Sequence, residues 1–281
     1  MSRLLLVDGS NLLFQMFFGM PARIVGRRGN AIQGTLGFVG ALLRIIRMTS
    51  PTHVAVLFDG ENGSDRVTLD PDYKSNRTDY SQVPEEATPF SQMPDVYAAL
   101  DYLGIVHSET VDCEVDDLMA GYARTPGDLH EVIIASQDSD FFQLVTDSVT
   151  LLRYRGDRTV LCTPDYVRER YGIEPSQYAD HKALTGDASD HIKGADKVGP
   201  KTATQLLRAF GTLEGILASI DRIERPSVRA SIAESRDRLR LNYKLIKLDR
   251  AVDLPFDMDA MTYCPSDATT RDVLRGIGLV E

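Results

Sequence analysis

Three apolar runs of strand length in this sequence each end in an acidic residue. The runs LLLV, VAVLF and VIIA lead to Asp8, to Asp59 and to the pair Asp138 and Asp140. Helical patterns separate the runs, which indicates a parallel sheet. Ligands of open parallel sheets bind beyond the carboxyl ends of the strands, so one crevice is expected to collect these four carboxylates. A single acid after a strand is usually a turn or helix cap. Three strands ending in this way favour a functional site.

The remaining periodicity predicts a doubly wound α/β domain followed by a helical module. Strands are expected at 4–7, 53–58, 132–135 and 149–152, and helices at 33–48, 93–103 and 115–123. A polar insertion at 61–92 interrupts this pattern, and such long insertions are usually functional or disordered. From Gly186 onward, short helical stretches alternate with Gly and Pro. We therefore expect an α/β core at 1–182, with the insertion at 61–95, and a helical module at 183–281.

Further carboxylates lie near the predicted crevice. Glu114, Asp116 and Asp117 open the helix at 115–123, where acids also complement the helix dipole, and GDASD adds Asp187 and Asp190. Gathered carboxylates repel one another unless cations bind between them. Oxygen ligands without a His or Cys cluster select Mg²⁺ or Mn²⁺. Two such ions favour phosphodiester hydrolysis, with the carboxylate of Asp116 at the centre of the chemistry.

The charge distribution is compatible with a polyanionic partner despite a net charge of −10. The nine carboxylates of the predicted site account for nearly all of this excess. Residues 201–250 contain 11 Lys and Arg against 6 Asp and Glu, so the later lobe is basic beside an acidic one.

The cysteine content and the first residues indicate the cellular setting. Three cysteines without CxxC spacing argue against a disulfide framework and a structural zinc site and favour the cytoplasm. The start MSRLLLVDGS is typical of a strand rather than a signal peptide, and no apolar stretch is long enough to span a membrane. A monomer is the default expectation.

Several motifs occur in an order that resembles a known family. The strings DCEVDD, SQDSDFFQL and GDASDHIKGADKVGPKTA resemble the metal-binding motifs of bacterial and phage 5′ nucleases, including the N-terminal domain of bacterial DNA polymerase I. No polymerase segment follows, as in stand-alone members. The resemblance implies a PIN-like core, a helical arch and a helix-hairpin-helix-like (helix-3-turn-helix) DNA-binding module. It assigns a first metal to Asp8, Asp59, Glu114, Asp116 and Asp117, and a second to Asp138, Asp140, Asp187 and Asp190.

Within the insertion, DPDYKSNR resembles the entrance of the family's arch. The resemblance implies that Lys74 and Arg77 approach the scissile phosphate, where cations neutralise developing charge. Arg66 lies just upstream and is assigned to DNA binding. Tyr73 has two open readings, stacking on a terminal base or packing in the protein.

The segment GADKVGPKTATQLLRAF predicts a tight turn that leads into a helix beginning near Pro200. Exposed amides at such a helix start bind phosphate without reading base sequence. In the resembling family this turn grips duplex DNA and holds K⁺. The corresponding residues here are Lys193, Gly194, Lys197, Val198, Gly199, Lys201 and Thr202. Lys197 stands where relatives have glycine, which questions the turn geometry.

Together these features predict a structure-specific 5′ nuclease. It would act as a flap endonuclease and 5′-3′ exonuclease on flapped or 5′-ended duplex DNA, and on RNA–DNA primer hybrids, with two Mg²⁺ or Mn²⁺ ions. Two alternatives remain at this point: a PIN-type metal-dependent ribonuclease and a non-catalytic protein that binds DNA structures.

Overall fold

The computed structural model of the protein describes residues 2–20, 22–60, 66–124 and 131–281. Within these residues, six strands form one sheet in the order β3-β2-β1-β4-β5-β6. All neighbours are parallel except β5 and β6. The strands are β1 (Arg3–Asp8), β2 (His53–Phe58), β3 (Val106–Glu109), β4 (Glu131–Ala135), β5 (Val149–Arg153) and β6 (Val160–Cys162).

The central strands form where the sequence is continuously apolar. Strands covered on both faces need such runs, and Leu4 to Val7 of β1 are fully buried. Chain order reverses at β1, which pairs with β2 on one side and β4 on the other. The predicted parallel sheet is therefore confirmed, together with its switch point. The edge strands β3 and β6 were not predicted, because the four residues of β3 are mostly polar and the apolar run of β6 is only three residues long.

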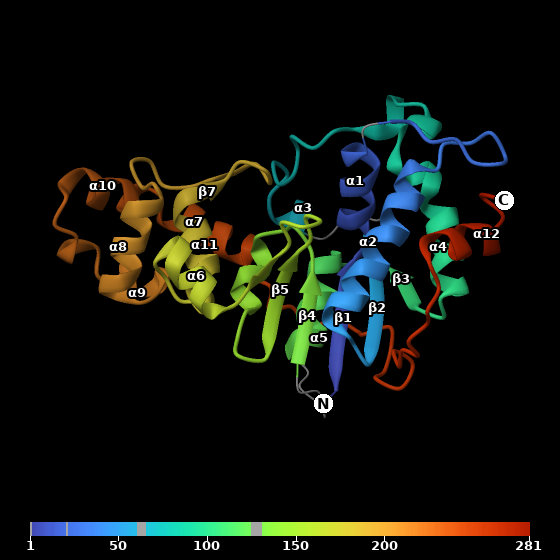
Figure 1. The fold of residues 1–281 in the computed structure, drawn as a ribbon. Helices are drawn as coiled ribbons and strands as arrows, with labels where there is room; N and C mark the ends of the chain where they lie inside the picture. Colours follow the sequence, from blue (N-terminus) through green and yellow to red (C-terminus); the bar gives the residue numbers. More distant parts are fainter. Residues whose placement is uncertain (1, 21, 61–65, 125–130) are drawn as a thin grey trace.

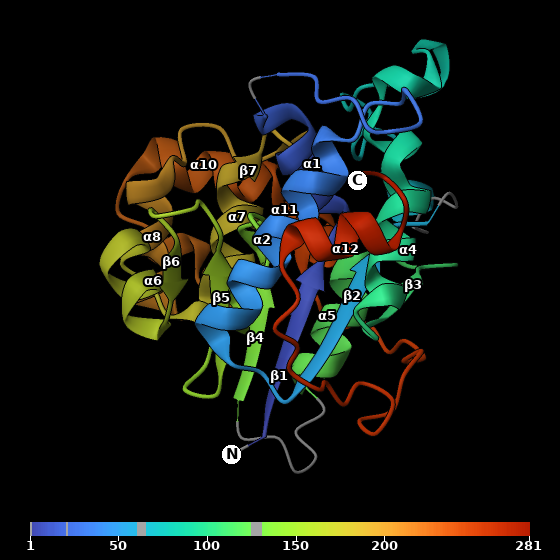
Figure 2. The same ribbon diagram turned by 45° about the vertical axis from the view of Figure 1, so that its right-hand side comes forward.

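Helices cover both faces of the sheet (Figures 1 and 2). Leu5 and Val7 point to the face covered by α1 (Gly9–Gly19), α2 (Gln33–Thr49), α4 (Met93–Tyr102) and α12 (Thr270–Gly276). Leu4 and Leu6 point to the other face, which α5 (Val115–Arg124) covers. The expected helices at 33–48, 93–103 and 115–123 are confirmed as α2, α4 and α5. The mostly parallel sheet with helices on both faces, the predicted fold class, is likewise confirmed.

A helical lobe extends the core beyond β5 and β6 (Figure 1). Its elements are α6 (Pro164–Tyr171), α7 (Tyr178–Thr185), α8 (Pro200–Phe210), α9 (Leu213–Ala218), α10 (Pro226–Glu234), α11 (Arg236–Ile246) and the hairpin of β7 (Gly186–Asp187) and β8 (Ile192–Lys193). The short 3-10 helices η5 (Pro175–Gln177) and η6 (Ile220–Arg222) connect α6 to α7 and α9 to α10, and η4 (Asp140–Leu144) lies between β4 and β5 of the sheet. The apolar cluster around Leu4 and Leu6 continues without a break into this lobe.

The chain leaves the helical lobe after α11 and returns to the first domain. Backbone bonds of 2.9 Å from Val54 to Met261 and from Tyr263 to Thr52 fix it beside β2, and α12 then packs on α2 and α4 (Figure 2). The division expected after residue 182 lies inside α7, and α12, which was expected in the later module, packs on α2 and α4. A returning segment has no signature in local periodicity.

The polar insertion runs over the carboxyl ends of the strands (Figure 1). Residues 61–65, where the expected arch begins, lie outside the described residues. The described part holds only short helical pieces: α3 (Arg66–Leu69), η1 (Tyr80–Gln82), η2 (Glu85–Ala87) and η3 (Pro89–Gln92). Across the described ranges, no helix is both long and apolar enough to cross a membrane.

Candidate carboxylate site

Strand ends bring the first acids together as predicted. Asp8 ends β1, Asp59 follows β2, and Asp138 follows β4. Together with Asp116 from the first turn of α5 they line a cleft of about 210 Å³ at the switch point of the sheet. The side chains of Lys74 and Arg77 line the same cleft. The structure thus gathers four acids and two cations from segments that are far apart in sequence. We call the four acids, Asp8, Asp59, Asp116 and Asp138, the first group.

These acids sit in an environment that disfavours their charge. Burial, with the neighbouring Asp59 and Asp138, raises the pKa of Asp8 to about 7. Burial also raises the pKa of Asp59, with Glu114 adding to the effect and Lys74 opposing it. For Asp116, burial and Asp138 raise the pKa well above its ordinary value. In the described residues no salt bridge joins Asp8, Asp59, Asp116 or Asp138 to a Lys or Arg.

Hydroxyl groups and backbone amides hold this first group in place. The Asp8 carboxylate accepts hydrogen bonds from the backbone amide of Asn11 at 2.9 Å and from the Ser136 hydroxyl at 2.8 Å. Asp59 donates its amide to the Ser10 hydroxyl at 2.9 Å. Sequence reasoning missed Ser10, Asn11 and Ser136, although VDGSN and ASQD place them within three residues of the acids. Asp8 is therefore both the N-cap of α1 and a wall of the cleft.

Glu114 lies at the side of the first group and is held by cations. Its carboxylate accepts from Lys74 at 2.8 Å, from Arg66 at 2.7 Å and from the Tyr73 hydroxyl at 3.3 Å. Burial alone would raise the pKa of Glu114, but Lys74 and Arg66 hold it below its usual value. Tyr73 is 6% exposed and packs in the apolar core, and its stacking on a terminal base stays a prediction.

Asp117 lies behind the cleft in a buried ion pair. Its side chain is fully buried and accepts both arms of the Arg66 guanidinium, at 2.7 and 3.0 Å. Arg66 itself is 2% exposed. In this conformation the guanidinium faces Asp117 and Glu114 rather than the surface, and its contact with DNA stays a prediction. Asp117 supports the helix start that carries Asp116 and does not line the cleft.

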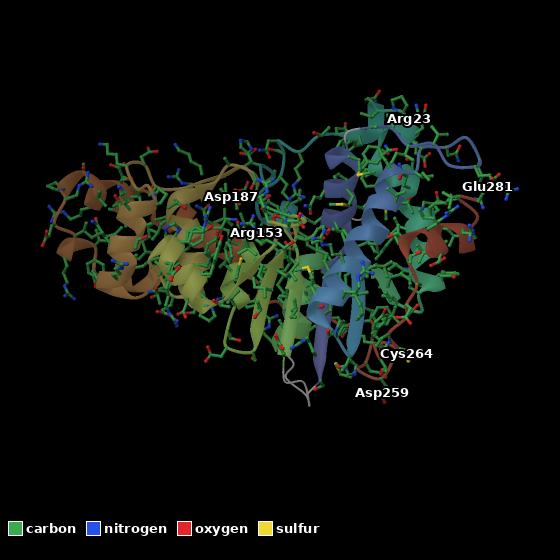
Figure 3. The ribbon with its side chains drawn as sticks, in the orientation of Figure 1. Arg23, Arg153, Asp187, Asp259, Cys264 and Glu281 are labelled. Carbon is green, nitrogen blue, oxygen red and sulfur yellow. The ribbon has the colours of Figure 1, made fainter. Side chains whose placement is uncertain are left out.

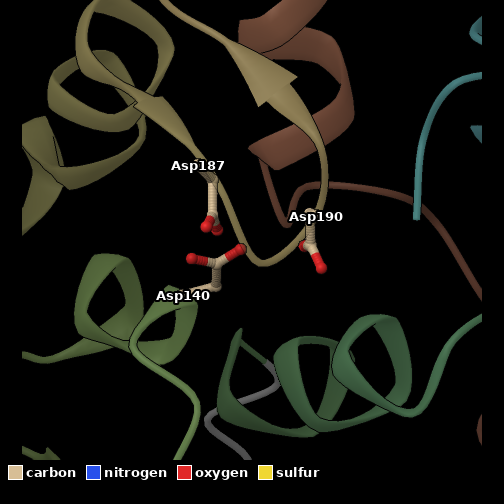
Figure 4. A group of neighbouring side chains, drawn as sticks. All are labelled: Asp140, Asp187 and Asp190. Carbon is tan, nitrogen blue, oxygen red and sulfur yellow. The ribbon is translucent and has the colours of Figure 1, made fainter. Parts of the chain in front are cut away.

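A second group of acids lies beside the first. Carboxylate oxygens of Asp140, Asp187 and Asp190 lie within 4.8 Å of one another (Figure 4). Asp140 comes from η4, Asp187 ends β7, and Asp190 lies in the turn between β7 and β8, where the helical lobe meets the strand ends (Figure 3). Lys182 of α7 reaches into this group and forms ion pairs with Asp140 and Asp187.

The electrostatics of the second group differ from those of the first. Burial and Asp138 raise the pKa of Asp140 to about 7 against the opposing pull of Lys182. At Asp187 burial is outweighed by Lys182, which lowers the pKa. Sequence reasoning missed Lys182, whose only signal is its place five residues before Asp187.

The base of the insertion is attached to this same hairpin. Arg77 donates to Asp190 at 3.0 Å, the Lys74 amide donates to the Asp190 carbonyl at 3.0 Å, and Ser75 bonds to His191 at 2.7 Å. Lys74 and His191 both adopt left-handed backbone, at φ 57° and 59°. These contacts fix the backbone of Lys74 beside the hairpin, while its ammonium pairs with Glu114 and lines the cleft of the first group.

The turn before α8 is tight and contains a lysine in left-handed backbone. Lys197 adopts φ 63°, so a lysine takes the left-handed conformation that glycine usually supplies. Gly194 packs so closely that an added Cβ would lie 2.3 Å from the Thr185 carbonyl carbon. Pro200 begins α8 as predicted. On this surface Lys193, Lys197, Gly199 and Lys201 are exposed, Thr202 is half-buried, and Val198 and Gly194 are buried.

The donor set of the first group fits a hard divalent cation. Four carboxylates without a cationic partner among the described residues, three of them with raised pKa values, lose their mutual repulsion when such an ion binds. The second group offers three more oxygen donors, but the Lys182 ammonium lies among them.

Sequence models of one family match the chain in succession. The model described as the 5′-3′ exonuclease N-terminal resolvase-like domain matches residues 3–172, and the model described as the 5′-3′ exonuclease C-terminal SAM fold matches 173–269.

Among curated proteins, the chain resembles the thermostable DNA polymerase I of Thermus thermophilus, at 34% identity over 258 residues, and DNA polymerase I of Bacillus caldotenax, at 33% over 268 residues. The matches cover 92% and 94% of this chain but 30% of each relative. The chain thus spans under a third of the length of these relatives.

Solved structures share the fold. The T5 D15 protein co-crystallized with metal ions superposes with a TM-score of 0.71 at 23% identity, covering 88% of this chain and 89% of that one. The catalytic core of Rad2 in complex with DNA substrate superposes with a TM-score of 0.61 at 13% identity, covering 98% and 86%. Because the two family models cover most of the chain and the fold agrees, the chain belongs to the 5′-3′ exonuclease family.

Proposed function

We propose that the protein is a divalent-metal-dependent 5′ nuclease, acting as a flap endonuclease and 5′-3′ exonuclease on DNA with a 5′ flap or a 5′ end. The observation that carries this proposal is the cleft in which Asp8, Asp59, Asp116 and Asp138 face Lys74 and Arg77. Carboxylates that lack a cation, beside basic groups at the same opening, suit a phosphodiester rather than a neutral substrate.

Mg²⁺, or Mn²⁺ in its place, is the ion that these oxygen donors favour. The first group would hold one ion, with Glu114 beside it, and Asp138 with Asp140, Asp187 and Asp190 would hold a second. A bound ion of this class activates water and neutralises charge on a phosphate. Asp117 supports the first group from behind through Arg66.

The basic residues would position the substrate. Lys74 and Arg77 lie where they can neutralise phosphoryl oxygens, and Arg77 presents a fork that matches two of them. The exposed start of α8, with Lys201 in its first turn, suits a duplex backbone. Lys193 and Lys197 add positive charge beside it. The turn at 194–199, with Lys197 in left-handed backbone, is compatible with a K⁺ held by loop carbonyls.

Solved relatives support DNA as the partner. One is a flap endonuclease of bacteriophage T5 in a pseudo-enzyme-product complex with DNA and metal ions, at a TM-score of 0.71 and 22% identity, and the Rad2 core is bound to DNA substrate. RNA–DNA primer hybrids are a further proposed substrate, since contacts to a phosphate backbone do not select the base. A cytoplasmic location is proposed from the thiols, which are all free.

The deciding experiment incubates the protein with a 5′-flap duplex and Mg²⁺ or Mn²⁺, beside Asp116→Ala and Lys74→Ala. Cleavage at the flap junction by the unmodified protein, lost in Asp116→Ala, is expected. A protein that binds the flap without cutting it with either metal would instead be the non-catalytic DNA-binding alternative. Preference for structured RNA over flaps would indicate the PIN-type ribonuclease.

A further inference from the structure

The two carboxylate groups differ in how their charge is balanced. In the second group the Lys182 ammonium contacts oxygens of both Asp140 and Asp187, and Arg77 pairs with Asp190. Every acid of that group therefore has a cation from the protein. In the first group the described residues supply no salt bridge to Asp8, Asp59, Asp116 or Asp138.

Lys182 occupies a position that the fold fixes. Lys182 is only 8% exposed. Its helix, α7, is buried from Tyr178 to Leu184 in the core of the helical lobe. The oxygens of Asp140, Asp187 and Asp190 lie within 4.8 Å of one another, and the ammonium lies against two of these carboxylates. An ammonium is a compact point charge with three donors, so it satisfies several carboxylates at once.

A divalent ion and this ammonium cannot share the same oxygens. Like charges at such separations repel strongly in a buried setting. A metal entering the second group must therefore push the lysine stem aside and break its contacts with Asp140 and Asp187. In the first group a metal ion does not have to displace a lysine or arginine among the described residues, and its binding only relieves repulsion between carboxylates.

We propose that Lys182 is the resident cation of the second carboxylate group, so that a divalent ion enters this group only by displacing its ammonium. The first group is then a metal site without a salt bridge to a Lys or Arg in the part of the chain that the structure describes, whereas the second group is a metal site that Lys182 occupies until a divalent ion displaces it. This inference rests on the proposed function in naming both groups as metal sites. The two ideas are separable, because metal binding is measured without any DNA or cleavage.

The test counts bound Mn²⁺ by electron paramagnetic resonance of the free ion, using the full chain. For the unmodified protein we expect one tight site and a second at least tenfold weaker. Lys182→Met keeps the length of the side chain and removes its charge, so it should strengthen the second site at least tenfold and leave the first within twofold. Lys244→Met, which removes an exposed lysine charge from α11, is the matched control and should change neither site.

Asp140→Asn identifies which binding event belongs to which group, and it retains the pair of Lys182 with Asp187. It should abolish the weak event and preserve the tight one. Two equal sites in the unmodified protein would overturn the proposal even if Lys182→Met failed to fold. So would a Lys182→Met protein, folded by circular dichroism, with unchanged second-site affinity. A different result would separate the two ideas. If the unmodified protein does not cut flap DNA but Lys182→Met binds the second Mn²⁺ more tightly, the nuclease function is contradicted and this inference stands.

Discussion

Removing the Arg66 guanidinium should destabilise the protein rather than only weaken its grip on DNA. Arg66 makes three bonds of 2.7 to 3.0 Å, two of them to Asp117 and one to Glu114. Arg66→Met keeps the apolar stem and leaves the fully buried Asp117 carboxylate without its main partner. An unpaired buried charge is costly, because neither water nor a counter-ion solvates it.

The structure sets the expected size of this effect. Losing one partner of a buried pair costs about 3 to 5 kcal/mol. Glu114 keeps Lys74 at 2.8 Å, and the Arg250 guanidinium lies 3.6 Å from Asp117, so the lower end applies. A loss of about 3 kcal/mol corresponds to a fall in melting temperature of roughly 6 to 12 °C for a chain of this size.

Urea unfolding followed by circular dichroism in EDTA measures this loss without bound metal. Arg240 supplies the matched control, since it makes the same two-bond fork with Glu214 at 2.8 Å but both side chains are about half exposed. Arg240→Met should cost under about 1 kcal/mol. In the double variant Arg66→Met with Asp117→Asn the buried charge is gone, so its cost should be roughly 1 kcal/mol or more below the sum of the single variants. Unchanged stability of Arg66→Met with weaker DNA binding would refute the reasoning and restore the surface role predicted from sequence.

Three further outcomes are expected. In EDTA the raised pKa of Asp8, about 7, means that the folded protein holds a proton that the unfolded chain releases above about pH 4. The free energy of unfolding should therefore fall by up to about 4 kcal/mol between pH 4 and 7. Thermal melts should show that added Mg²⁺ removes this dependence of stability on pH. A free energy of unfolding that rises with pH in EDTA would contradict the raised pKa of Asp8. Gly194→Ala should cost about 1 to 3 kcal/mol in urea unfolding, because its Cβ meets backbone, whereas Gly19→Ala meets nothing within 4 Å and should be near neutral. Lys201→Ala should weaken duplex binding equally for all sequences and lower the salt slope by about one, and a loss restricted to certain sequences would exclude a backbone contact.

The sequence alone predicted most of the core. Short apolar runs that alternate with helical patterns are typical of parallel strands covered on both faces, so β1, β2, β4 and β5 followed from them. Parallel strands align their carboxyl ends, which is why the meeting of Asp8, Asp59 and Asp138 was predictable. The contribution of Asp116 followed from its place at a helix start. The roles of all these residues in binding metal and DNA remain predictions.

Only the tertiary structure decided which charges neutralise which. Arg66 and Asp117 are 51 residues apart, and Lys182 and Asp140 are 42 apart, so no local pattern pairs them. The fold made Arg66 a buried partner of Asp117 and placed a lysine among the acids of the second group. It also returned α12 to the first domain. A sequence pattern fixes the face on which a side chain lies, whereas ion pairs depend on distances between elements, and packing alone sets those distances.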